Sequence, residues 1–207
     1  MSFSQANNFN NKMPTLIDTL PIGSNTLLKN ITLVISGILI LWMTSQIRIN
    51  LFFTPVPVTG QTFGVLLLAS SYGSKLGIFT IFSYLLVGIV GLPVFAGGGS
   101  GWEYFSGATA GYLIGFGIAA YFVGLLAEKG WDRKPFLVIS SMILGNAVIY
   151  FFGVLWLSFS YSIGISKAIS LGLTPFIIGD IFKILIAATL LPGMWQLSSY
   201  FKFDKNN

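Results

Sequence analysis

The sequence contains neither cysteine nor histidine, and few of its residues carry a charge. Of 207 residues, 11 are basic and 6 are acidic, so charged residues make up 8% of the chain. The absence of cysteine and histidine excludes thiol nucleophiles, disulfides and metal sites built from these side chains. It also removes the commonest general base. We therefore expect no catalytic residues, no metal and no cofactor, and we predict that the chain is not an enzyme.

Apolar residues dominate the composition. Hydrophobic residues make up 54% of the chain, which also holds 24 glycines. A soluble domain carries about 25% charged residues and could not hide this much apolar surface from water. The composition therefore predicts an all-α integral membrane protein whose surroundings are the lipid bilayer. The net charge of +5 comes from basic residues scattered through short connections, so we expect no nucleic-acid partner.

The apolar segments predict six transmembrane helices within a membrane domain at 31–200. The expected helices are 31–47, 61–71, 75–92, 107–127, 136–156 and 174–200. The second is shorter than the roughly 20 residues that span a bilayer, so it would span only with help from the preceding loop. A mildly amphipathic stretch at 158–172 predicts a short surface helix or lid. Residues 1–30 and 201–207 are interpreted as polar cytoplasmic tails.

The basic residues predict which way the bundle faces. Six spans place both termini on one side, and eight basic residues fall on that side: Lys12, Lys29, Lys75, Lys129, Arg133, Lys134, Lys202 and Lys205. Only Arg48 and Lys167 fall on the other side. Cytoplasmic connections carry the excess of lysine and arginine, so we expect a multi-pass plasma-membrane protein with cytoplasmic termini. The long connections at 48–60, 93–106 and 158–173 then form an outer side suited to a binding site.

Asp180 and Lys183 are the charged residues that lie well inside a predicted span. Their spacing of three places them on one helix face. Each costs about 2.5–3.5 kcal/mol at the centre of a bilayer, and such residues normally mark a pathway or a site. We interpret the pair as ligand-binding. The alternative is a mutually neutralised pair that only fixes helix packing.

Other polar and aromatic candidates are individually weaker. Gln61 and Asn146 are uncharged polar residues near helix ends or interiors, where an interhelical hydrogen bond explains them at least as well as a ligand. Four aromatic residues are candidates for an apolar cavity, namely Phe95, Trp102, Tyr112 and Trp156, although aromatic residues also anchor proteins at membrane interfaces.

The glycines show two patterns. Gly107, Gly111, Gly115 and Ala119 recur every four residues and predict close packing against another helix. The run Gly97-Gly-Gly-Ser-Gly101 lacks the Lys-Ser/Thr that follows a phosphate-binding loop, so we do not interpret it as one. The sequence has no nucleotide-binding motif, and an ATP-driven function would need a partner.

Four motifs resemble the biotin transporter BioY family. They are Pro55-Val-Pro-Val-Thr-Gly-Gln-Thr-Phe63, Gly91-Leu-Pro-Val-Phe-Ala-Gly-Gly98, Gly111-Tyr-Leu-Ile-Gly-Phe116 and Gly179-Asp-Ile-Phe-Lys183. The resemblance covers roughly residues 30 to 198. It implies the six-helix bundle of a substrate-binding S component of an energy-coupling-factor transporter, with an outward-facing biotin site. It also implies that Asp180 and Lys183 bind the ligand.

The function expected from this resemblance is biotin binding and uptake. ATPase subunits and a transmembrane coupling protein would be the partners. An S component for another small vitamin, a solitary transporter and a structural membrane protein without a ligand remain alternatives. An intramembrane enzyme has little support. The predicted substrate-binding residues are Asp180, Lys183, Gln61, Thr59, Phe95, Tyr112, Asn146 and Trp156.

Overall fold

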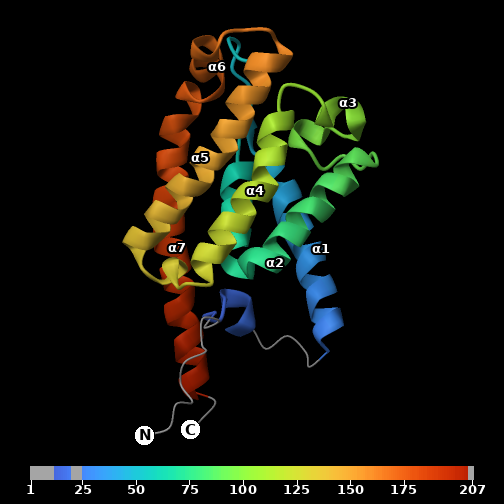
Figure 1. Ribbon diagram of the computed structural model, residues 1–207. Coiled ribbons are helices and arrows are strands. Elements are labelled where there is room, and N and C mark those ends of the chain that lie inside the picture. The colour runs from blue at the N-terminus through green and yellow to red at the C-terminus, as the bar shows by residue number, and fades with distance from the viewer. Residues whose placement is uncertain (1–11, 20–24, 205–207) are drawn as a thin grey trace, which may run out of the picture.

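The computed structural model describes residues 12–19 and 25–204, with side chains as far as residue 200. Its long helices are α1 (Thr26–Gln46), α2 (Gln61–Ile89), α4 (Ala110–Ala127), α5 (Pro135–Ser160) and α7 (Ile177–Asp204). The short elements are α3 (Gly101–Phe105), α6 (Ile165–Gly172), strands β1 (Arg48–Ile49) and β2 (Val58–Thr59), and 3-10 turns at Leu16–Thr19, Ala96–Gly98, Trp131–Arg133 and Thr174–Phe176. Figure 1 shows the long helices as a bundle.

Within the described residues, five helical segments are long and apolar enough to cross a membrane. Large apolar side chains cover the outside of the bundle; Phe136, for example, is 76% exposed and Ile178 is 71% exposed. Such a surface suits lipid rather than water. The prediction of an all-α membrane bundle is confirmed.

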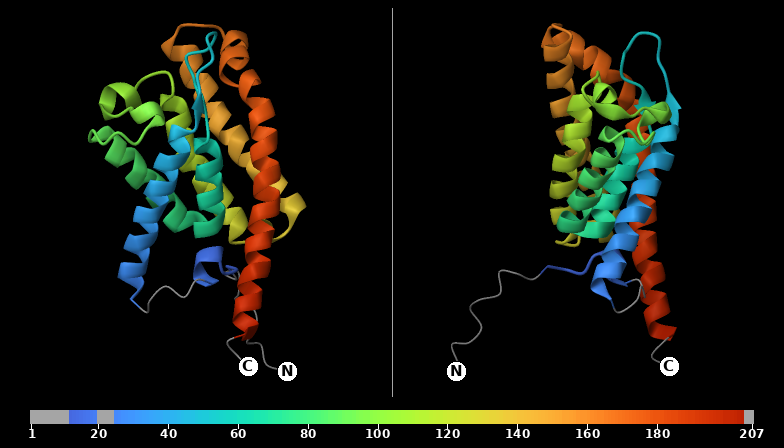
Figure 2. Two further views of the ribbon diagram at one scale, coloured as in Figure 1. Left: turned by 180° about the vertical axis from the view of Figure 1, so that it is seen from behind. Right: turned by 90° about the vertical axis from the view of Figure 1, so that its right-hand side faces the viewer.

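Six helices were predicted, and two of them are the arms of α2. Gly73 breaks this helix with φ 77° and ψ −179°, a conformation that glycine adopts without steric cost. A Cβ built on Gly77 would lie 3.3 Å from the Cα of Ala69, whereas eight residues of straight helix advance about 12 Å. The chain therefore folds back, and the two arms form a V in Figures 1 and 2.

The predicted small-residue face of α4 packs against α5. A Cβ on Gly111 would overlap the backbone of Phe152, and one on Gly115 would lie 3.0 Å from the Cα of Ile149. Only glycine permits this approach, so the expectation of tight helix packing is confirmed. The α4 helix also packs against α2 and forms the centre of the bundle.

The connection between α1 and α2 is a narrow hairpin at one end of the bundle. β1 and β2 pair in antiparallel register, with Arg48 opposite Thr59. The hairpin loop is tied to α6 because the hydroxyl of Thr54 donates a 2.8 Å hydrogen bond to the carbonyl of Leu171. Figure 2 shows this loop rising beside α6, and the helix predicted near 158–172 is therefore α6.

The start of α1 and the end of α7 both lie at the opposite end of the bundle (Figure 1). α1 begins at Thr26 rather than near residue 31, because the side chain of Asn25 accepts hydrogen bonds from the amides of Leu27 and Leu28. α7 continues to Asp204, past the predicted boundary at 200. The predicted tails therefore include helix at 26–30 and 201–204, and 1–11, 20–24 and 205–207 lie outside the described residues.

The segment 12–19 packs beneath the break in α2. Leu16 and Ile17 are buried there. Glu128, at the end of α4, connects this segment to the break: Oε1 accepts hydrogen bonds from the amide (2.9 Å) and hydroxyl (2.7 Å) of Ser74, and Oε2 lies 2.7 Å from the ammonium of Lys12. Burial alone would raise the pKa of Glu128, but the hydrogen bonds from Lys12 and Ser74 outweigh it and lower that pKa.

We predict that Glu128→Gln destabilises the protein by on the order of 1 kcal/mol near neutral pH, because it weakens hydrogen bonds to a charged acceptor. A lowered folded-state pKa gives stability above the ordinary glutamate pKa, and that stability is lost as the pH falls through the lowered value. The difference between variant and wild type should therefore shrink in acid. Thermal unfolding in detergent across this range measures it. Glu103→Gln is the control, because Glu103 is exposed and forms no ion pair with any described residue. Equal effects of both variants would contradict this role.

Candidate ligand-binding site

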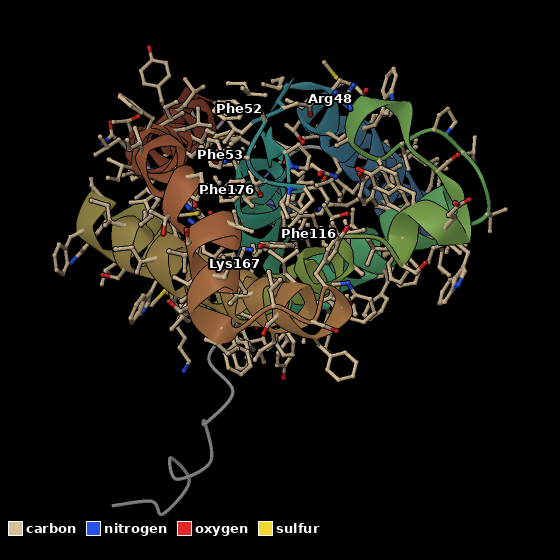
Figure 3. The ribbon with its side chains drawn as sticks, turned by 90° about the horizontal axis from the view of Figure 1, so that it is seen from above. Arg48, Phe52, Phe53, Phe116, Lys167 and Phe176 are labelled. Atoms are coloured by element: carbon tan, nitrogen blue, oxygen red, sulfur yellow. The ribbon has the colours of Figure 1, made fainter. Side chains whose placement is uncertain are left out.

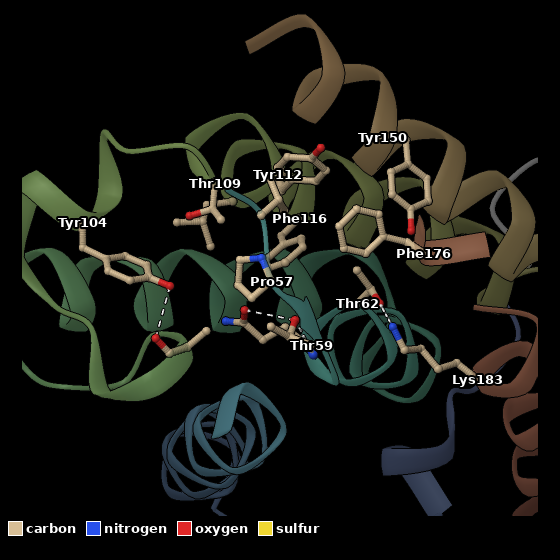
Figure 4. A pocket seen from close by; sticks show the side chains of 14 residues that line it. Pro57, Thr59, Thr62, Tyr104, Thr109, Tyr112, Phe116, Tyr150, Phe176 and Lys183 are labelled. Carbon is tan, nitrogen blue, oxygen red and sulfur yellow. Dashed lines mark hydrogen bonds between the residues drawn. The ribbon is translucent and has the colours of Figure 1, made fainter. Parts of the chain in front are cut away.

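A cavity lies inside the end of the bundle that carries the hairpin, α3 and α6. It encloses about 470 Å³ of space not filled by atoms, including its opening. Figure 4 shows the lining side chains. They are Val56, Pro57, Thr59, Gln61, Thr62, Ala96, Tyr104, Thr109, Tyr112, Leu113, Phe116, Tyr150, Phe176 and Lys183.

An ion pair stands at one end of the cavity. The ammonium of Lys183 donates to Asp180 Oδ1 at 3.0 Å and to the hydroxyl of Thr62 at 2.9 Å. The hydroxyl of Tyr150 donates to Asp180 Oδ2. Lys183 and Tyr150 line the cavity, whereas Asp180 is 5% exposed and lies behind them. An ammonium has three protons, so Lys183 keeps one for a ligand.

Tyr104 stands at the other end of the cavity, as Figure 4 shows. Its hydroxyl donates to the carbonyl of Ala96 at 3.3 Å. Its ring stacks on Phe95, with 5.2 Å between ring centroids, and rests on Gly99, where any Cβ would overlap it. Burial raises the pKa of Tyr104, and the positive charge of Arg48 opposes that rise. Gly99, within the glycine run, therefore packs directly against the ring of Tyr104.

The first turn of α2 supplies the polar floor between these ends. Gln61 donates to the hydroxyl of Tyr84 at 2.7 Å, and that hydroxyl donates to the carbonyl of Val94 at 2.8 Å. Thr59 donates to Gln61 Oε1 at 3.4 Å. These bonds fix Gln61 and Thr59 between the hairpin and the second arm of α2.

Half of the predicted substrate-binding residues line the cavity. Four of the eight do so: Lys183, Gln61, Thr59 and Tyr112. Asp180 contacts the wall from behind. Phe95 is fully buried beneath Tyr104, and the indole of Trp156 donates to the carbonyl of Gly107 at 2.9 Å, outside the lining. For Phe95 and Trp156 the structure therefore gives packing roles in place of the predicted cavity positions.

Asn146 lies in a second, smaller cavity that shares Thr62 and Lys183 with the first. It is 7% exposed, and its Oδ1 has no hydrogen-bond partner among the described residues. The expected interhelical hydrogen bond through this oxygen is therefore not formed. A water molecule that donates to Asn146 Oδ1 would satisfy this oxygen, since buried polar atoms normally find a partner.

Sequence reasoning missed several lining residues. Tyr150 lies one helical turn after Asn146, so helix periodicity could have found it. Thr62 directly follows Gln61 and so lies on a different part of the helix surface, where periodicity gives no signal for it. Tyr104 follows the glycine run closely. Phe116 lies on a helix that is apolar on all sides, where no periodic signal separates a cavity-lining residue from a lipid-facing one.

The lining joins apolar walls to polar ends. Leu113, Phe116 and Phe176 contribute apolar surface, and Figure 3 shows Phe116 and Phe176 at this end of the bundle. A paired lysine stands at one end and a tyrosine at the other. The fold and cavity thus define a helical membrane protein with a pocket suited to a small, partly apolar molecule with polar groups.

The chain belongs to the BioY family, whose profile matches residues 12–200. It is 43% identical to the biotin transporter BioY of Thermotoga maritima over 136 residues, 66% of this chain and 79% of that protein. It is 33% identical to the biotin transporter BioY2 of Lactococcus lactis subsp. cremoris over 86% of this chain and 98% of that protein. The crystal structure of the S-component for biotin from an ECF-type ABC transporter matches with a TM-score of 0.76 and 25% identity, covering 84% of this chain and 95% of that one.

We predict that Tyr112→Phe loosens the outer wall of the cavity. The hydroxyl of Tyr112 donates to the carbonyl of Gly172 at 2.8 Å and so joins α4 to the end of α6. Its loss should cost about 1 kcal/mol and lower the melting temperature in detergent. Tyr121→Phe, on the exposed side of α4, is the matched control and should leave it unchanged. A melting temperature for Tyr112→Phe equal to that of the control would show that this bond does not hold α6.

Proposed function

We propose that this chain binds biotin in the cavity and mediates its uptake as the S component of an ECF-type transporter. The observation that carries the proposal is a cavity with a paired lysine at one end, in a chain whose family relatives are named biotin transporters. These names also agree with the expectation that the chain is not an enzyme.

The chemistry of biotin matches the cavity. The ureido carbonyl is an acceptor for the remaining proton of Lys183, and the ureido N–H groups are donors for oxygens at the same end. The sulfur-containing ring and the aliphatic chain suit the surface of Leu113, Phe116 and Phe176. Polar groups at the ends fix the orientation, and apolar walls supply the burial.

Asp180 has two roles in this proposal. Its charge neutralises Lys183 inside the bundle, where an unpaired ammonium is costly. Each carboxylate oxygen accepts more than one hydrogen bond, so Asp180 retains capacity for a ureido donor beside its bonds to Lys183 and Tyr150. The contact between Asp180 and biotin stays a prediction.

The transport cycle needs partners. No nucleotide-binding motif occurs in the sequence, so ATPase subunits and a transmembrane coupling protein would supply the energy. The ratio of eight basic residues to two supports cytoplasmic termini. In that orientation the cavity opens to the outside of the plasma membrane.

A thermal shift of the purified protein tests the ligand directly, because a molecule that binds the native state raises the melting temperature by mass action. Biotin should raise it, and other vitamins should not. If another vitamin raised the melting temperature and biotin did not, that vitamin and not biotin would be the substrate. No shift with any of them would contradict a vitamin-binding role.

The ion pair gives a sharper prediction. Asp180→Asn should weaken biotin binding roughly ten- to a hundredfold, since hydrogen bonds to charged groups contribute about 1.5–3 kcal/mol. Lys183→Met should also weaken it, because the ureido carbonyl loses its donor. Isothermal titration calorimetry of the folded variants measures both effects. The packing alternative predicts normal affinity in the folded double variant, because replacing both members of a pair is often nearly neutral.

The orientation has its own test. A reporter that is active only in the cytoplasm, fused after Asn207, should be active, and a periplasm- or surface-specific reporter at the same place should be silent. The opposite pattern would place the termini outside and the cavity on the cytoplasmic side.

A further inference from the structure

Arg48 is a cation without a counter-ion at the end of the bundle that holds the cavity. It is exposed, and among the described residues no carboxylate lies within ion-pair distance of its guanidinium. Its side chain forms no hydrogen bond to any described residue. Lys183, by contrast, is neutralised by Asp180. The net positive charge at the cavity therefore comes from Arg48.

Three contacts place Arg48 beside the cavity. It pairs with Thr59 across the β1–β2 ladder, and opposite residues in an antiparallel pair project to the same face. Thr59 lines the cavity. The guanidinium also lies against Gly97, next to the lining residue Ala96, and its charge acts on Tyr104.

These contacts place Arg48 at the Tyr104 end, opposite Lys183. In Figure 4 Tyr104 and Lys183 stand at the two ends of the cavity. Figure 3 shows Arg48 on the side of α3, away from Phe176. A molecule lying along the cavity therefore meets a neutralised lysine at one end and a free guanidinium beside the other.

We propose that Arg48 binds the carboxylate of the ligand and so fixes its direction in the cavity. This inference rests on the proposed function, which makes the ligand biotin. A guanidinium without a counter-ion binds a carboxylate through two parallel hydrogen bonds, which suits arginine better than lysine. The ureido ring then lies at Lys183, where the charge is already balanced and a neutral group fits.

Gly97 makes this position of Arg48 possible. A Cβ at residue 97 would overlap the guanidinium, so a side chain there would displace the end of Arg48 from this position. Gly97 has φ 71°, and its neighbour Gly98 has φ 74° with no atom within 4 Å of a built Cβ. Both glycines therefore adopt a positive φ that other residues rarely adopt, but only Gly97 contacts Arg48.

The test compares biotin with biotinamide, which carries the same ring and chain but no charge. Arg48→Gln should weaken biotin binding about ten- to a hundredfold, the loss expected for a bidentate charged contact. Its affinity for biotinamide should change less than about threefold, a factor worth only about 0.6 kcal/mol. Arg48→Lys should bind biotin with intermediate affinity. Calorimetric titration of the full chain in detergent measures all of these, and an unchanged melting temperature without ligand confirms folding.

Gly97→Ala and Gly98→Ala form a matched pair. Both impose the same backbone strain, but only Gly97→Ala displaces the guanidinium. Gly97→Ala should therefore reproduce the selective loss of biotin affinity, and Gly98→Ala should not.

The outcomes separate this inference from the proposed function. Equal losses for biotin and biotinamide in Arg48→Gln, or no loss for either, would overturn the role of Arg48 while leaving biotin as the ligand. A wild-type protein that binds neither compound would overturn the proposed function and this inference with it.

Discussion

The ion pair between Lys183 and Asp180 is the constraint on which the site depends. A charge inside a membrane bundle costs several kcal/mol unless it is paired and hydrogen-bonded. Here the pair on α7 is hydrogen-bonded to Thr62 of α2 and to Tyr150 of α5. Without these bonds α7 would face lipid along much of its length. Three helices therefore converge at one end of the cavity because a buried charge needs partners from each of them.

Glycine supplies the complementary constraint. The break at Gly73 turns α2 back on itself, so the polar first turn of that helix, with Gln61 and Thr62, lies at the cavity. Gly111 brings α4 and α5 into backbone contact. In the loop before α3, Gly97 accommodates Arg48 and Gly99 accommodates Tyr104. A run that resembles a phosphate loop in composition thus supports side chains instead.

The helical bundle and the ion pair could be predicted from the sequence, because long apolar segments and charges within them are strong signals. Long apolar segments predict the bundle, and the charges at Asp180 and Lys183 stand out against an apolar helix. The V shape of α2 could not be predicted from the sequence. It depends on the positive φ of Gly73, and nothing in the sequence distinguishes this glycine from the other 23. Nor could the sequence separate Phe95, which supports Tyr104 from below, from Phe116, which lines the cavity. That difference depends on the packing of distant segments.

The central claim is that the cavity holds biotin in one direction, and a structure of the protein with biotin bound tests it most directly. The account predicts ligand density inside the lining of the cavity, with the ureido ring at Lys183 and Tyr150 and the carboxylate within hydrogen-bond distance of the Arg48 guanidinium. Density with the carboxylate at Lys183, or biotin bound outside this cavity, would contradict it.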